Sequence, residues 1–82
     1  MEIKVKTITG TMYCVDIDDT STIADIKTMI LTKTGVPAQQ QRYIHGGKLL
    51  SDEQIVMNLP EAKVCHNTVG ITLNMILSLR GG

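Results

Sequence analysis

The sequence predicts an α+β domain in which one helix packs across a mixed sheet of four to five strands. Three observations lead to this prediction. Apolar and polar residues alternate near both ends of the 82-residue chain, which is the two-residue period of half-buried strands. A single stretch near residue 25 has the spacing of an amphipathic helix. The length is that of one domain, so we treat residues 1–82 as a single domain with a flexible C-terminal tail at 78–82.

The first element is a β-hairpin. Ile3 and Val5 are the inward apolar residues of residues 1–7, and Tyr13 and Val15 continue the alternation over residues 11–17. Gly10 lies between the two segments and suits a turn that needs a positive φ.

A helix is predicted over residues 23–34. Thr22 stands three residues before Asp25, which is a variant of the capping box. Gly35 suits the left-handed residue that ends a helix, and Pro37 prevents continuation. Helical spacing is shown by Ile23, Ile26 and Ile30.

Two further elements complete the sheet. Residues 40–50 read as a second hairpin with Gly46 and Gly47 in its turn, and Tyr43 and Leu50 facing inward. The last strand covers residues 71–79. One face of that strand carries Ile71, Leu73, Met75, Leu77 and Leu79.

The segment over residues 51–70 is the least regular part of the chain. Residues 55–59 are compatible with a helical turn that Pro60 stops, and Val64 and Val69 are candidates for anchoring the segment to the core. The sequence does not fix a register here.

Composition excludes several function classes. Eight basic and eight acidic residues cancel, and no basic block occurs, which argues against nucleic acid or an anionic membrane as the main partner. With two aromatic residues there is no platform for stacking bases. The apolar runs are too short to span a bilayer, and the N-terminus lacks the pattern of a signal peptide. We expect a cytoplasmic and nuclear protein whose Cys14 and Cys65 are free thiols.

Several segments resemble the ubiquitin family. They are residues 1–10, the tripeptide Gly35-Val36-Pro37, residues 40–44 and the ending Leu79-Arg80-Gly81-Gly82. The match runs without a gap to about residue 54 and resumes near Thr72, after an expanded segment near residues 55–70. The resemblance implies the β-grasp fold, which agrees with the element order above. It also implies a protein modifier that is not an enzyme and has no cofactor of its own.

The C-terminus carries the strongest functional signal. Without Cβ atoms, Gly81 and Gly82 form a thin, flexible end that a narrow enzyme channel could admit. With Arg80 before them, the resemblance implies that an activating enzyme adenylates the final carboxylate with ATP. The acyl group would then pass to thiols of the activating and conjugating enzymes and end as an isopeptide on a target lysine. The alternative is a frayed glycine-rich end that has no role in conjugation.

Exposed aliphatic residues give a second signal. Ile8 lies in a hairpin turn, and Ile44 and Ile76 lie on the polar sides of their strands. Single exposed apolar residues are ordinary, and the sequence alone does not show that these three meet. The resemblance implies that they form, with Gly47, the hydrophobic patch that receptors bind.

The lysines give a third signal. The resemblance implies chain building for those whose positions match the family: Lys6, Lys27, Lys33 and Lys48. Lys48 is the strongest candidate because it matches the main chain-forming lysine. Lys63 lies in the expanded segment, so its number does not establish equivalence. For each lysine the alternative is ordinary solvated charge.

Other functions stay open. Ser78 stands where the family presents an arginine to its activating enzyme, which favours either a different activating enzyme or a non-covalent interaction domain that is never conjugated. A sulfur carrier shares the Gly-Gly end. Cys65 and His66 supply too few ligands for zinc and no orienting group for a nucleophile, so we expect no metal and no catalytic site. For a modifier, the implied partners of this monomer are activating and conjugating enzymes, ligases, deconjugating proteases, ubiquitin-binding receptors and substrate proteins.

Overall fold

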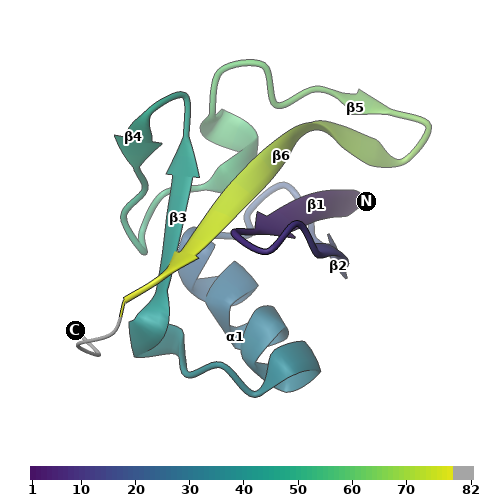
Figure 1. Cartoon of the computed structure of the whole chain (residues 1–82). Coiled ribbons are helices and arrows are strands. Elements are labelled where there is room, and N and C mark those ends of the chain that lie inside the picture. Colours follow the sequence, from purple (N-terminus) through teal and green to yellow (C-terminus); the bar gives the residue numbers. More distant parts are fainter. Residues whose placement is uncertain (79–82) are drawn as a thin grey trace.

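The fold is one helix held against a mixed sheet, as predicted (Figure 1). The computed structural model describes residues 1–78. The elements in chain order are β1 (Glu2–Thr7), β2 (Met12–Asp16), α1 (Ile23–Thr34), the short 3₁₀ helix η1 (Ala38–Gln40), β3 (Gln41–His45), β4 (Lys48–Leu49), the 3₁₀ helix η2 (Val56–Asn58), β5 (Val64–Cys65) and β6 (Thr68–Leu77). Within these residues the strands are ordered β2-β1-β6-β3-β4, and β5 pairs with β6.

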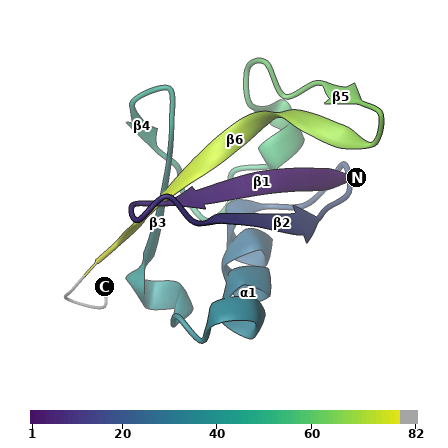
Figure 2. The ribbon, with the colours of Figure 1, turned by 45° about the vertical axis from the view of Figure 1, so that its right-hand side comes forward.

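The two end strands of the chain lie side by side at the centre of the sheet. β1 pairs with β6 in parallel, whereas β1–β2, β3–β6, β3–β4 and β5–β6 are antiparallel. Figure 2 shows α1 crossing one face of this sheet. The face that meets the helix is aliphatic, with Ile3, Val5, Val15 and Leu73 almost completely buried against Ile23, Ile26 and Ile30. This pairing and the single helix are those of the β-grasp fold.

The helix begins and ends where the sequence predicts. Thr22 accepts a hydrogen bond from the Asp25 backbone N–H (3.3 Å), and the Asp25 carboxylate accepts one from the Thr22 N–H (2.9 Å). This reciprocal capping box satisfies two donors at the helix start. At the other end Gly35 has φ 78° and donates to the Leu31 carbonyl at 2.8 Å. A left-handed residue at this place ends the helix, and glycine adopts it without a Cβ clash.

A buried polar network joins the helix to β3. The Tyr43 hydroxyl donates to Gln41 Oε1 at 2.7 Å, and Gln41 Nε2 donates to the carbonyls of Lys27 and Val36 at 3.0 and 2.9 Å. Both side chains are fully buried. Burial also raises the pKa of Tyr43, because the phenolate would be charged in an apolar core.

The expanded segment contains a hairpin that the sequence did not reveal. β6 begins at Thr68 and not at residue 71, because β5 pairs with its first residues through a two-residue turn. His66 and Asn67 form that turn with φ 52° and 64°, the positive values of a type I′ hairpin. Residues 1–78 therefore hold six strands where four to five were expected.

One candidate core position is wrong. Val64 is 46% exposed because it lies on the edge strand β5, whereas Val69 in the central strand is buried as predicted. Leu77 shares the face of Met75 but is 48% exposed, because it is the last residue of β6. Leu79 lies outside the described residues. The helical turn before Pro60 is present as η2, and Leu50 packs against the core in a half-buried position.

Candidate functional site

The sheet register brings the three predicted isoleucines to one end of the uncovered face. Ile44 of β3 lies opposite Asn74 of β6, so Ile76, two residues further along β6, is its diagonal neighbour on the same face. Thr7 of β1 lies opposite Met75, which places Ile8 level with Ile76. Ile8 is 77% exposed and Ile76 is 36% exposed, while Ile44 is half-buried. We call Ile8, Ile44 and Ile76 the isoleucine patch.

One member of this surface was missed by the sequence reasoning. Leu49 of β4 lies directly opposite Ile44 and is 62% exposed. β4 has two residues, which is too short for alternation to show which way a side chain points. The turn before it is made by Gly46 and Gly47, which both have positive φ.

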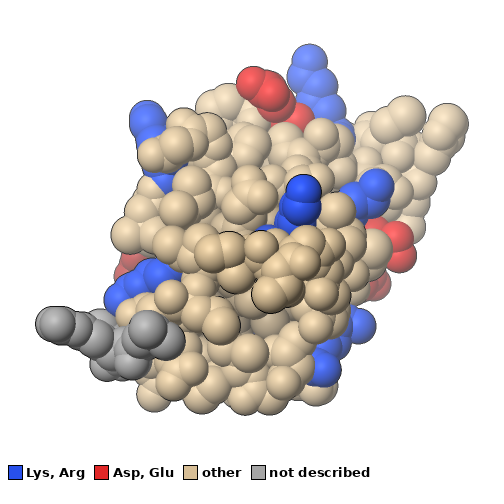
Figure 3. All heavy atoms as spheres, viewed as in Figure 1, with Lys and Arg blue, Asp and Glu red and all other residues tan. Residues whose placement is uncertain are grey.

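Two lysines lie near this surface. Lys6 lies beside Asn74 on β1, and Lys48 lies opposite His45 at the β3–β4 turn. Figure 3 shows basic side chains spread over a largely uncharged face, with few acidic ones in view. The surface therefore combines exposed aliphatic side chains with two nearby lysines, a composition suited to an apolar partner surface that has acidic neighbours.

The candidate lysines differ sharply in exposure. Lys6, Lys33 and Lys48 are exposed. Lys27 is 8% exposed, and its Nζ forms an ion pair with Asp52. Its amine is therefore engaged in the folded chain, so a role as an acceptor would need that pair to open first. The sequence could not show this, because Asp52 is brought to the helix by backbone hydrogen bonds such as Ala24 N–H to the Asp52 carbonyl (3.1 Å).

The predicted conjugation residues Arg80, Gly81 and Gly82 lie outside the described residues. Ser78 is the last described residue, and its N–H donates to the Gln40 carbonyl at 2.7 Å. This hydrogen bond extends the β3–β6 ladder past Leu77, at the end of β6 that carries Ile76.

The Cys65–His66 pair lies exposed at the β5–β6 turn. Cys65 Sγ is 3.8 Å from His66 Nδ1. In residues 1–78 no group of three His, Cys, Asp or Glu side chains is arranged to hold a metal ion. No helix within the same residues is long and apolar enough to cross a membrane.

Comparison with known proteins identifies the fold's family. Residues 3–60 match the model of the ubiquitin family. The chain belongs to that family. It is 42% identical to the ubiquitin-like protein NEDD8 of Dictyostelium discoideum, over all of this chain and 99% of the relative. It is 39% identical to ubiquitin-like protein 1 of Schizosaccharomyces pombe, with 97% of that relative covered, and 35% identical to the NEDD8-like protein RUB1 of Saccharomyces cerevisiae, with 99% covered.

The relatives also bear on what the chain does chemically. The ubiquitin-like modifier family is non-enzymatic, which agrees with the expectation that the chain is not an enzyme. The matches extend over the whole of this chain and nearly the whole of each relative. The resemblance to these three ubiquitin-like relatives therefore runs from end to end.

Proposed function

We propose that this chain is a ubiquitin-like modifier, joined through the Gly82 carboxylate to lysines of target proteins. The end-to-end match to NEDD8-like proteins carries the proposal, because it spans the body and the Arg80-Gly81-Gly82 ending together. A modifier needs a compact body that partners recognise and a carboxyl end that enzymes activate. The fold supports the first requirement, and the Arg80-Gly81-Gly82 sequence supports the second.

Receptors would bind the isoleucine patch together with Leu49 and Gly47. Ile8, Ile76 and Leu49 expose large aliphatic side chains, which lose contact with water when a partner covers them. Lys6 and Lys48 at its border favour a partner with acidic groups beside its apolar surface. His45 and Asn74 flank Ile44 and set which receptors fit.

The implied pathway supplies the other partners. An activating enzyme would use ATP, followed by conjugating enzymes and ligases, and proteases would remove the modifier. Lys6, Lys33 and Lys48 are the exposed candidates for chain building, with Lys27 held by Asp52. We expect the protein in the cytoplasm and nucleus, where such a pathway would operate.

A non-covalent interaction domain is the second candidate. Ser78 favours it, because a serine lacks the charge-assisted hydrogen bonds that an arginine would give an activating enzyme. The same substitution is compatible with a different activating enzyme. An activation assay distinguishes a modifier with a different activating enzyme from a non-covalent domain.

The test of conjugation is an activation assay. The purified chain is incubated with ATP and either the ubiquitin-activating enzyme or the activating enzyme of NEDD8-like proteins, and a non-reducing gel detects the thioester. A thiol-sensitive adduct that disappears when Gly82 is deleted is the expected result. Absence of the adduct with both enzymes would favour the non-covalent domain.

The patch is tested separately by binding. Ile44→Ala is expected to weaken binding to a ubiquitin-receptor domain by at least about tenfold, because it removes a central apolar contact. Leu31→Ala is the matched control: Leu31 is 41% exposed, but it lies on α1, across the sheet from the patch. Equal losses in the two variants would contradict the assignment.

A further inference from the structure

The β5–β6 turn carries two metal-ligating side chains that the proposed function does not use. Cys65 is the last residue of β5, and His66 is the first residue of the turn. Both residues are exposed, and Cys65 is a free thiol. Cys65 Sγ lies 3.8 Å from His66 Nδ1. Thiolate sulfur and imidazole nitrogen are the ligands from which structural zinc sites are built.

The separation of these two atoms is close to that of two ligands on one zinc ion. In a tetrahedral site, Zn–S and Zn–N bonds of about 2.3 and 2.0–2.1 Å place the sulfur and the nitrogen roughly 3.6 Å apart. A small rotation of either side chain would therefore bring both atoms onto one ion. Without metal, the same contact is a weak hydrogen bond between the thiol and the ring.

The hairpin fixes the backbone of both ligands. Cys65 pairs with Thr68 in the β5–β6 ladder, and His66 and Asn67 form the two-residue turn between them. Because the backbone is already held, less conformational freedom is lost when a metal binds. Figures 1 and 2 show this turn projecting at one end of the molecule, beyond the start of β1. A second copy of the chain can therefore approach it.

One chain supplies two of the four ligands that a structural zinc site needs. In residues 1–78 no group of three His, Cys, Asp or Glu side chains is placed to hold a metal ion. A second copy related by a two-fold axis contributes the same two side chains, which gives two sulfur and two nitrogen ligands. Each Cys65 thiol releases one proton to solvent, so the two thiolates balance the charge of Zn²⁺. The chain itself has eight basic and eight acidic residues, so no net repulsion keeps two copies apart.

We propose that Cys65 and His66 form half of a zinc site that two copies of this chain complete. Each copy binds the ion through Cys65 Sγ and His66 Nδ1. Zinc therefore converts the monomer into a dimer that holds one ion for every two chains. This site does not depend on the proposed function.

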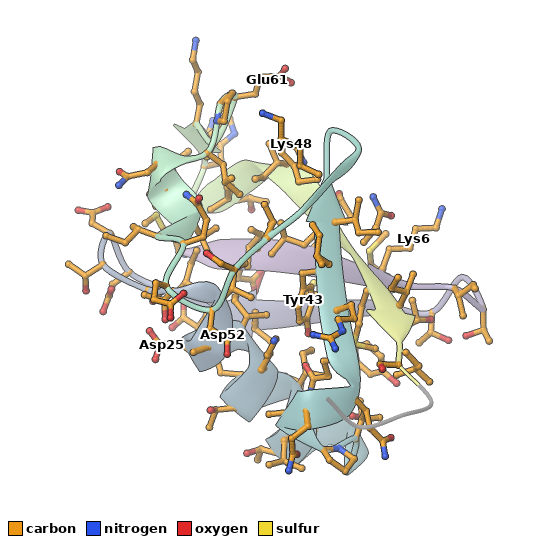
Figure 4. All side chains as sticks on the ribbon, turned by 90° about the vertical axis from the view of Figure 1, so that its left-hand side faces the viewer. Lys6, Asp25, Tyr43, Lys48, Asp52 and Glu61 are labelled. Carbon is orange, nitrogen blue, oxygen red and sulfur yellow. The ribbon has the colours of Figure 1, made fainter. Side chains whose placement is uncertain are left out.

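The zinc site lies far from the isoleucine patch. Thr68 is opposite Cys65, and Ile76 is eight residues further along β6, a distance of about 25 Å along a strand. Figure 4 views the molecule from the side opposite the turn, with Tyr43 and Lys48 on the near side. The zinc bridge thus leaves the patch of each copy uncovered. If the chain is the modifier proposed above, the dimer offers two patches to a receptor that has two binding domains.

The experiment measures the mass of the full chain in solution with and without zinc. Light scattering after size-exclusion chromatography is carried out at several chain concentrations, with a phosphine reductant present so that no disulfide forms. Zinc added at half the chain concentration should shift the mass from that of one chain to that of two, and EDTA should reverse the shift. Co²⁺ in place of Zn²⁺ should give the intense visible absorption of a tetrahedral thiolate complex.

Four variants locate the ligands. Cys65→Ser and His66→Asn each remove one ligand, and asparagine tolerates the positive φ of the turn, so both should abolish the zinc-dependent dimer. Cys14→Ser is the matched control for the thiol, because Cys14 is also exposed but lies on β2. Asn67→Gly is the control for the turn, because it changes the same hairpin without removing a ligand. Both controls should dimerise with zinc as the wild type does.

Three results would overturn the proposal. They are zinc bound at one ion per chain without a dimer, a dimer that forms equally in EDTA, and a zinc-dependent dimer that survives Cys65→Ser or His66→Asn. The activation assay gives an independent answer, because it uses the carboxyl end of the chain and no metal site. A chain that is activated but does not dimerise with zinc would keep the proposed function and lose this site.

Discussion

Tyr43→Phe tests whether the buried polar network stabilises the fold. The substitution removes the hydroxyl that donates to Gln41 Oε1 and changes little else in the ring. In the described residues no buried side-chain nitrogen or oxygen lacks a partner, so the variant would create the first one. An unsatisfied buried acceptor costs about 1–3 kcal/mol. For a domain of this size, that corresponds to a fall in Tm of about 5–20 °C.

The pH dependence gives this prediction a second signature. Burial raises the pKa of Tyr43 above its ordinary value of 10.0, so above that pH the unfolded chain loses a proton that the folded chain keeps. Stability from this residue is therefore complete below pH 10.0 and falls above it, by at most about 1.4 kcal/mol per pH unit. Phenylalanine has no such proton. The stability gap between wild type and Tyr43→Phe should consequently narrow above pH 10.0.

Urea unfolding followed by circular dichroism measures both effects. Tyr13→Phe is the control, because Tyr13 is half-buried and its hydroxyl forms no hydrogen bond with another residue in 1–78. It should change stability by less than about 0.5 kcal/mol. The reasoning is refuted if the two variants lose the same stability at neutral pH, or if the Tyr43→Phe gap stays constant through pH 11 (about one unit above the ordinary tyrosine pKa).

Three further predictions follow from the described contacts. Asp52→Asn should destabilise the chain more than Lys27→Met. Asp52→Asn leaves the buried Lys27 ammonium unpaired, whereas Lys27→Met leaves the half-exposed Asp52 carboxylate in water. The free energies of unfolding of the two variants, measured in urea, should differ by about 1–3 kcal/mol. Gly70→Ala would place a Cβ 3.2 Å from the Lys63 carbonyl, so amide hydrogen exchange should become faster in β5 without a matching loss in α1. Replacing His66 and Asn67 together by Asn and Gly should stabilise the β5–β6 turn by about 0.5–1 kcal/mol, measured as a rise in Tm.

Local signals were sufficient for the helix and the first hairpin. The Thr22–Asp25 capping box and Gly35 each form contacts with residues a few positions away. The ends of α1 can therefore be predicted from the local sequence. The alternation over β1 is similarly local, and Ile3 and Val5 are buried as predicted.

Long-range packing decided the features that could not be predicted. The β5–β6 turn is made by His66 and Asn67 and contains no glycine, and β5 is too short to show alternation. In the sequence Lys27 resembles an ordinary lysine on a helix surface. Its ion pair forms only because the fold brings Asp52 against the helix. The isoleucine patch likewise depends on the β1–β6 and β3–β6 registers, which the family resemblance supplied and the residue pattern alone did not.

The parallel pairing of β1 with β6 also determines how the domain responds to mechanical force. The two strands run in the same direction, so Met1 and Leu77 lie toward opposite ends of the ladder. Tension applied between the two ends of the chain would load the hydrogen bonds of this ladder together, in shear. An antiparallel pair pulled from its open end would instead unzip one bond at a time. A protein that unfolds the chain by pulling between its ends would therefore have to break the β1–β6 hydrogen bonds together.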